Sequence, residues 1–97
     1  MKRFHIALSV RDLKKSVRDY SRRLGDRPSI VVRGKYALWR TKTLNFSIRV
    51  ASPAGRLRHI GWEDPKAKKF SCSKDLNGLI WEHFSSAQQK KEIKELL

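Results

Sequence analysis

The sequence predicts one α+β domain, in which a βαβββ module joins a shortened second module that has lost its helix. Two kinds of pattern predict it. Several segments alternate between apolar and polar residues, as half-buried strands do, and one segment near the N-terminus has apolar residues at helical spacing. A short motif of the first predicted strand also recurs in the second half of the chain. We expect the strands to form one curled, mixed sheet within a single domain of residues 1–97, with the first module at residues 1–50.

The first predicted strand covers residues 3–10, Arg-Phe-His-Ile-Ala-Leu-Ser-Val. Its even-numbered positions are apolar and fall on one face, because successive side chains of a strand point to opposite sides. The other face carries His5, Ala7 and Ser9. The strand is therefore expected to bury one face against a helix and to present a more polar face on the other side.

A helix is predicted directly after this strand, over residues 13–24. Asp12 is a good N-cap, because its side chain can accept a hydrogen bond from a free backbone N–H of the first turn. Gly25 is the expected C-terminal stop. The apolar residues inside the helix are spaced i, i+4, i+7 and i+11, so they form one stripe for burial. These residues are Leu13, Val17, Tyr20 and Leu24.

Three further strands complete the first module, at about residues 28–33, 35–41 and 43–50. In the last of them, apolar side chains alternate with the more polar Asn45, Ser47 and Arg49. The following segment, Ala51-Ser52-Pro53-Ala54-Gly55, is a linker by composition.

After the linker, Arg58-His59-Ile60-Gly61-Trp62 repeats the His-Ile pattern of Phe4-His5-Ile6. The interval is too long for a solenoid repeat, but it suits two related halves of one fold. We therefore assign residues 56–84 to the shortened second module. Residues 85–97 are assigned to a C-terminal helix that a serine at its start can cap.

The second module has no counterpart of the first helix. Asp64-Pro65 interrupts the chain, and a strand at about residues 68–73 follows almost at once. A turn at residues 75–78 then leads into a last strand at residues 79–84.

Composition is that of an ordinary folded domain, with 39% hydrophobic and 33% charged residues. No apolar run approaches the roughly 18 residues of a membrane-spanning helix, so we expect no membrane partner. Cys72 is the single cysteine and cannot form an internal disulfide, so a cytoplasmic location is expected. A domain this short has a thin core and an incomplete sheet with open edges, and we therefore expect a homodimer.

The net charge of +14 is the one extreme property of the chain. It would attract an anionic partner, whether nucleic acid, an acidic membrane or a small molecule. The basic residues are spread thinly along the sequence and do not form a block typical of a nucleic-acid-binding arm. The charge therefore favours an anionic partner without naming one.

Alternation within the strands also predicts which polar residues share a face of the sheet. The helix is expected to cover the apolar face of the sheet, which leaves the concave face for a polar pocket. His5 lies on that concave face. In the second module, Leu57, His59 and Gly61 are predicted to share one face of their strand.

On the last strand, Glu82 and Phe84 share a face. Two imidazoles and one carboxylate match the arrangement that holds divalent Fe, Mn, Ni or Zn with open coordination positions. We therefore predict a metal site made of His5, His59 and Glu82. The simpler alternative is that each histidine is only solvated or bonded to a neighbour. His83 lies on the opposite face by parity and is expected to be structural or exposed.

Five short motifs occur in an order and at a spacing that point to one superfamily. They are Phe4-His5-Ile6-Ala7 with Val10-Arg11-Asp12-Leu13-Lys14-Lys15-Ser16-Val17 and Tyr20; Tyr36-Ala37-Leu38-Trp39; Leu44-Asn45-Phe46; Arg58-His59-Ile60-Gly61-Trp62-Glu63; and Asp75-Leu76-Asn77-Gly78 with Ile80-Trp81-Glu82. Together they resemble the vicinal oxygen chelate superfamily of glyoxalase I, extradiol dioxygenases, fosfomycin and bleomycin resistance proteins and organoarsenical lyases. The second and third motifs resemble especially the cadmium-induced and arsenical-lyase branch.

This resemblance implies a glyoxalase-like fold and assigns the metal ligands to His5, His59 and Glu82, with Glu82 also in a catalytic role. It implies a divalent-metal-dependent lyase or isomerase acting on a small oxygen-chelating substrate. Because arginine recognises carboxylate and phosphate well, we expect Asn45, Ser47 or Arg49 to orient an anionic group of that substrate.

Two features depart from the family pattern. The second module lacks its helix, so part of the pocket wall is expected to be missing or to come from a second subunit. The arsenical lyases hold arsenic with a pair of cysteines in this region, whereas this chain has only Cys72. A thiolate clamp for a soft metal needs at least two sulfurs, which argues against arsenical cleavage.

Two other functions remain open at this stage. The chain could be a binding protein of the resistance type that sequesters a ligand without turnover, with walls supplied by Trp39, Trp62 and Trp81 unless these pack in the core. It could also bind nucleic acid through its charge, but it has no zinc-finger spacing, RNA-recognition aromatic motif or helix-turn-helix pattern, so we do not expect this.

Overall fold

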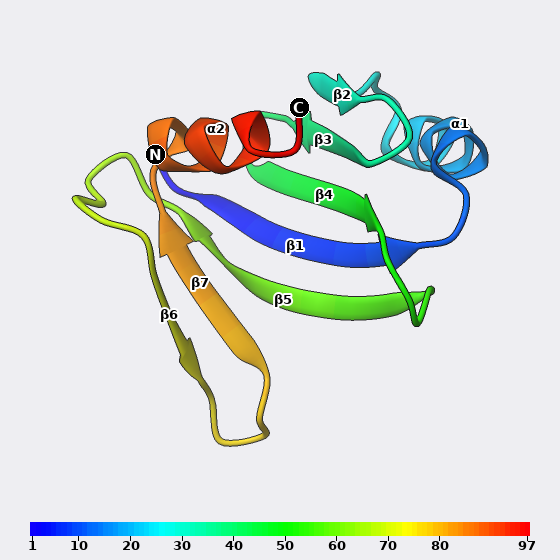
Figure 1. The fold of residues 1–97 in the computed structure, drawn as a ribbon. Coiled ribbons are helices and arrows are strands. Elements are labelled where there is room, and N and C mark those ends of the chain that lie inside the picture. Colours follow the sequence, from blue (N-terminus) through cyan, green and yellow to red (C-terminus); the bar gives the residue numbers. More distant parts are fainter.

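The structure, a computed structural model, describes all 97 residues and contains seven strands and two helices (Figure 1). The strands form one mixed sheet in the order β2-β3-β4-β1-β5-β7-β6, which confirms the predicted α+β class. The elements are, in chain order, β1 (Arg3–Val10), α1 (Leu13–Leu24), β2 (Ile30–Val32), β3 (Tyr36–Arg40), β4 (Leu44–Val50), β5 (Arg56–Glu63), β6 (Ser71–Lys74), β7 (Ile80–Phe84) and α2 (Ser86–Lys94).

Two sets of three strands repeat the same arrangement within this sheet. β4 runs parallel to β1 with β3 antiparallel on its far side, and β7 runs parallel to β5 with β6 antiparallel on its far side. The two sets meet at the antiparallel pair β1 and β5, where Ile6 is opposite Ile60. Since His5 and His59 each precede one of these isoleucines, the repeat places the two histidines at corresponding positions.

Local sequence defines both ends of α1, as predicted. The Asp12 side chain accepts a hydrogen bond from the backbone N–H of Lys15 at 3.0 Å. Gly25 ends the helix with a φ of 70°, a left-handed conformation that glycine adopts without strain. The predicted apolar stripe faces the sheet: Leu13 is buried and Val17, with the two later members, packs against the same core.

The main core lies between α1 and the first set of strands. Ala37, Trp39 and Ile48 are fully buried there. The indole Nε1 of Trp39 donates to the backbone oxygen of Asp26 at 3.1 Å, so its polar atom is satisfied. Burial of a large apolar side chain stabilises the folded state by roughly 1.5–3 kcal/mol. This cluster therefore holds the first set of strands in place, and with it the polar side chains on the opposite face of the sheet.

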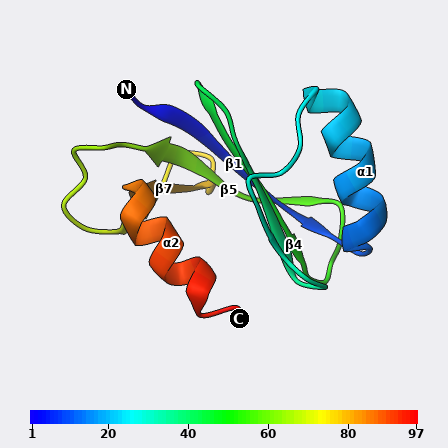
Figure 2. The ribbon, with the colours of Figure 1, turned by 90° about the horizontal axis from the view of Figure 1, so that it is seen from above.

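α2 lies on the opposite side of the sheet from α1 (Figure 2). A capping box starts it: the Gln88 side chain accepts from the Ser85 backbone N–H at 2.8 Å, and the Ser85 hydroxyl accepts from the Gln88 backbone N–H at 3.4 Å. Ile93 then packs into a second apolar cluster with residues of β2 and β3. The helix is thereby held against the concave face. Neither helix has the length and apolar composition needed to cross a membrane.

One expectation about β5 is wrong, because Leu57 and His59 do not share a face. β5 pairs His59 with Ala7 but Leu57 with Leu8, so the register shifts and Arg58 is the extra residue of a β-bulge. Leu57 therefore takes the side of Leu8, while both Arg58 and His59 line the concave face. Counting parity assumes an unbroken period of two residues, and that period ends at a bulge.

Three predicted boundaries shift by two residues or more. β2 starts later than expected, after Pro28, which has no N–H to donate to a strand ladder. β6 starts later because Phe70 turns inward and stacks on Phe84, with 5.6 Å between the ring centroids. The final helix ends at Lys94 and does not continue to Leu97.

Candidate metal centre

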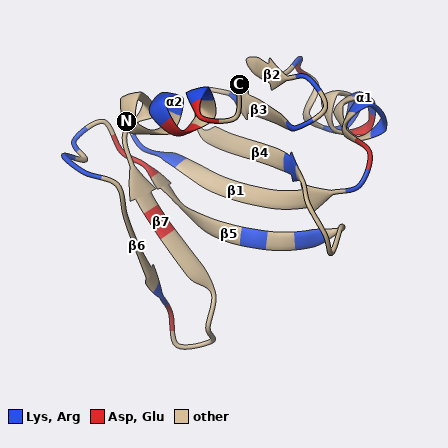
Figure 3. Ribbon diagram, viewed as in Figure 1, with Lys and Arg blue, Asp and Glu red and all other residues tan.

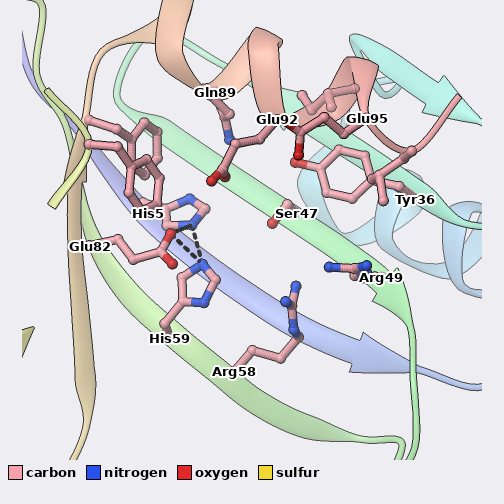
Figure 4. Close-up of a pocket in the computed structure, with 14 residues that line it drawn as sticks. His5, Tyr36, Ser47, Arg49, Arg58, His59, Glu82, Gln89, Glu92 and Glu95 are labelled. Atoms are coloured by element: carbon pink, nitrogen blue, oxygen red, sulfur yellow. Dashed lines mark hydrogen bonds and ion pairs between the residues drawn. The ribbon is translucent and has the colours of Figure 1, made fainter. Parts of the chain in front are cut away.

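Three donor atoms from three strands meet on the concave face (Figure 4). His5 Nε2 on β1 lies 2.9 Å from His59 Nε2 on β5, which lies 2.9 Å from Glu82 Oε1 on β7. The remaining separation, from His5 Nε2 to Glu82 Oε1, is 3.9 Å. The three residues thus form a group whose ligand atoms all lie within 4.8 Å of one another and could hold a metal ion.

These separations suit a divalent cation. Donors that lie about 2.0–2.2 Å from such an ion are roughly 3–3.5 Å from one another. The observed distances of 2.9, 2.9 and 3.9 Å bracket this range. Two imidazoles and one carboxylate are also a donor set that Fe, Mn, Ni and Zn accept, and three protein ligands leave positions for water or substrate.

A buried hydrogen-bond network determines which nitrogen of His5 faces the site. Asn45 Nδ2 lies 2.8 Å from Glu63 Oε1, and an ionised carboxylate can only accept, so this atom is the amide NH₂. The opposite amide atom is therefore the oxygen, and it lies 2.8 Å from His5 Nδ1. His5 must donate from Nδ1, which leaves the lone pair of Nε2 directed at His59 and Glu82. Fixing a ligand's tautomer in this way is the usual role of a residue behind a metal-binding histidine.

Glu63 is ionised although its side chain is only 2% exposed. Arg40 donates from Nε to Oε1 at 2.7 Å and from Nη2 to Oε2 at 2.9 Å, and Arg3 donates from Nη1 to Oε2 at 3.0 Å. Burial acts to raise the pKa of Glu63, but the hydrogen bonds from Arg40 and Asn45 outweigh burial and lower that pKa. A charged acceptor is therefore present behind Asn45 at neutral pH.

Gln89 of α2 completes the hydrogen bonding of Asn45. It accepts from Asn45 Nδ2 at 2.8 Å and donates from Nε2 to Asn45 Oδ1 at 3.1 Å. Both hydrogens of the Asn45 amide are then used, and its oxygen accepts from two donors. The position of α2 is thereby coupled to the orientation of His5.

The surroundings of His5 favour its neutral form. Burial lowers the pKa of His5, and the neighbouring His59 adds to this effect, while hydrogen bonding to Asn45 and the charge of Glu82 act in the opposite direction. A neutral imidazole is the form that binds a metal.

The close approach of β7 to β5 depends on a glycine. Gly61 is paired with Glu82, and a Cβ atom at Gly61 would overlap the main chain of Glu82. The missing side chain therefore lets β7 bring its carboxylate within reach of the two histidines.

His83, the third histidine, lies outside the cluster. Its Nε2 contacts Asp64 Oδ2 at 2.8 Å, and its side chain is 44% exposed. It thus takes a structural, partly exposed position, as its parity predicted.

A cavity of about 400 Å³ opens beside the three donors, between the concave face and α2. This volume is at the lower end of the range typical of small-molecule sites. One wall comes from the strands and the other from α2. The lining residues are His5, Tyr36, Ser47, Arg49, Arg58, His59, Phe70, Glu82, Phe84, Gln89, Glu92, Ile93, Glu95 and Leu96.

The residues expected to orient a substrate are placed at different depths. Ser47 and Arg49 line the cavity. Asn45 is fully buried behind His5, does not line the cavity and has its amide fully bonded, so it contacts His5 and would not contact a molecule bound in the cavity. Strand alternation correctly assigned Asn45 to the concave face, but alternation does not indicate how deeply a side chain is buried.

None of the three tryptophans lines the cavity. Trp39 lies in the core under α1. Trp62 and Trp81 pack edge-on against Phe4, with ring centroids 5.2 and 6.3 Å away. The possible aromatic walls of a sequestering pocket are therefore not built from these residues.

Arg58 and Glu92 are two of the cavity residues that the sequence reasoning missed. The β-bulge turns the Arg58 side chain onto the concave face, and Glu92 projects from α2 towards the other polar groups (Figure 4). Burial raises the pKa of Glu92, with further contributions from Glu82 and Glu95. α2 also forms the wall that was expected to be missing or to come from another subunit.

Replacing any one of the three donor residues is expected to weaken divalent-metal binding strongly. We expect His5→Ala, His59→Ala and Glu82→Gln each to weaken Zn²⁺ affinity by more than about 100-fold in calorimetry, since even residues behind the ligands typically contribute 10–100-fold. His83→Ala is the matched control and should bind Zn²⁺ like the parent. Equal loss in His83→Ala, or normal binding by His5→Ala, would rule out this ligand set.

Gly61→Ala should separate β7 from β5. We expect it to lower the free energy of unfolding by about 1–3 kcal/mol, as overpacking does, and to weaken Zn²⁺ binding because Glu82 moves. Gly34→Ala serves as control: Gly34 has a φ of 74° with open space around it, so the change should cost stability but leave metal affinity unaltered. Unchanged Zn²⁺ affinity in Gly61→Ala would contradict this role for the glycine.

Glu63 should make stability depend on acid pH. Because the folded state lowers the pKa of Glu63 below its ordinary value of 4.5, the charged group stabilises the fold above that pH, and this contribution is lost as pH falls through the lowered pKa. We expect Glu63→Gln to cost about 1–3 kcal/mol of unfolding free energy at pH 7. Denaturant titrations should show the difference from the parent shrinking below pH 4.5, and a constant difference would refute it.

Comparison with known proteins gives a fold relationship. No protein-family model matches the chain, and no curated protein sequence matches it. Among solved structures, a chain from the crystal structure of NAD-dependent benzaldehyde dehydrogenase from Legionella pneumophila is similar, with a TM-score of 0.59 and 12% sequence identity. The match covers 84% of this chain and 97% of that one. At this identity, the likeness shows a shared fold alone.

Proposed function

We propose that this protein is a divalent-metal-dependent lyase or isomerase acting on a small, anionic, oxygen-chelating molecule. The observation that carries the proposal is the convergence of His5 Nε2, His59 Nε2 and Glu82 Oε1 at one end of the cavity, with the His5 tautomer set by Asn45. Histidines that are merely solvated would not require such a buried network behind them.

His5, His59 and Glu82 would hold the metal. A divalent cation with open positions polarises bound oxygen atoms and favours loss of a proton from a neighbouring carbon. Ser47 and Arg49, further along the same wall, would orient the anionic group of the substrate. Phe84 and the apolar residues of α2 would limit access of water.

Two further observations support membership of the vicinal oxygen chelate superfamily. The two strand sets β1-β4-β3 and β5-β7-β6 repeat one arrangement, as a fold made of two related modules requires. His5 and His59 occupy corresponding positions of this repeat. Both agree with the motif resemblance, and we infer the glyoxalase-like relationship from them together.

Metal-dependent proton exchange tests the function. Protein loaded with Zn²⁺, Mn²⁺ or Ni²⁺ would be incubated in D₂O with a panel of α-hydroxy and α-keto carboxylates. Loss of the carbon-bound proton next to the carbonyl or hydroxyl group would be followed by ¹H NMR. We expect exchange of at least one compound that EDTA and Glu82→Gln abolish and His83→Ala leaves intact.

Other results would reject catalysis. Tight binding of a panel compound without exchange or turnover under any metal would favour a sequestering protein. Exchange that survives both EDTA and Glu82→Gln would show that the metal centre is not responsible.

A further inference from the structure

Arg49 and Arg58 bring two positive charges to the same cavity. Both β4 and β5 flank β1, and Ser9 of β1 pairs with Arg49 on one side and with Arg56 on the other. The bulge at Arg58 turns that side chain onto the concave face, across β1 from Arg49. Figure 4 shows both guanidinium groups on the part of the cavity away from Glu82.

Neither guanidinium has a carboxylate partner. No carboxylate oxygen lies within 4.0 Å of either group, although Arg3, Arg22, Arg23 and Arg40 all form such pairs elsewhere in the chain. Arg58 is half-buried and Arg49 is exposed at the cavity's side, and two like charges that line one cavity repel each other unless an anion lies between them.

Other basic residues do not share this setting. Lys and Arg are spread over helices, loops and strands (Figure 3). Arg56, two residues before Arg58 on the same strand, does not line the cavity. The pair is therefore a local feature that the net charge alone does not explain.

We propose that Arg49 and Arg58 form an anion subsite that takes the carboxylate or phosphate group of a small molecule bound in the cavity. This deepens the proposed function, on which the identity of the molecule as a substrate rests. Two neighbouring guanidiniums can each donate paired hydrogen bonds to an oxyanion. A molecule held there would direct its remaining oxygens toward His5, His59 and Glu82. The preferred substrate is thus bifunctional, with an anionic group at one end and chelating oxygens at the other.

Anion titration of the metal-free protein tests the subsite separately from the metal. Inorganic phosphate and acetate would be titrated in EDTA, 150 mM NaCl and pH 7.5, with backbone ¹⁵N–¹H NMR as the readout. Salt at this level screens the long-range attraction of a +14 protein. We expect saturable shifts centred on Arg49 and Arg58, and the tighter of the two anions identifies the group that the substrate carries.

Substitutions of single arginines test whether this pair binds the anion. Arg58→Gln and Arg49→Gln should each weaken anion binding by about tenfold or more, as loss of a charge-assisted contact does, whereas Arg56→Gln should not. His59→Ala should retain anion binding, so failure of the metal site would leave this result standing. Equal weakening by Arg56→Gln, or no effect of Arg58→Gln, would overturn the proposal.

Discussion

The buried carboxylate of Glu63 is the constraint on which the site depends. Two arginines keep it ionised, and an ionised carboxylate accepts hydrogen bonds only, so it determines which way the Asn45 amide points. Asn45 in turn makes His5 donate from Nδ1, which leaves Nε2 free to act as a ligand. Gln89 ties α2 into the same network. One carboxylate and two arginines at the ends of β1, β3 and β5 thus determine which nitrogen of His5, on the central strand β1, carries the proton.

The repeat of strands explains how a small domain assembles this site. Because β1 and β5 are adjacent and occupy equivalent places, one histidine from each falls on the concave face. β5 departs from the repeat at two positions, and both affect the site. Gly61 allows the carboxylate strand to approach closely, and the bulge at Arg58 adds a positive charge where regular alternation would not. α2 covers the concave face and closes a cavity over these groups.

Local sequence patterns were enough to predict β1, α1 and β4, because helix caps and strand alternation depend on residues that are close together in the chain. Alternation also made His5, His59 and Glu82 candidates for one face, because each lies on a stretch of strand where the period of two is unbroken, and the motif resemblance then selected them as ligands. Arg58 could not be found in this way, since a bulge is a property of the pairing between two strands. The depth of Asn45 depends on Gln89, which is 44 residues away in the chain and belongs to a helix with only a modest apolar stripe.

The protonated nitrogen of His5 can be identified by NMR. Long-range ¹⁵N–¹H NMR of the imidazoles, in EDTA and then with Zn²⁺, distinguishes a protonated from a free or metal-bound nitrogen. We predict that metal-free His5 carries its proton on Nδ1, and that Zn²⁺ shifts the Nε2 signals of His5 and His59 while those of His83 stay unchanged. A proton on Nε2 of His5 in the metal-free protein, or no shift of that nitrogen with Zn²⁺, would contradict it.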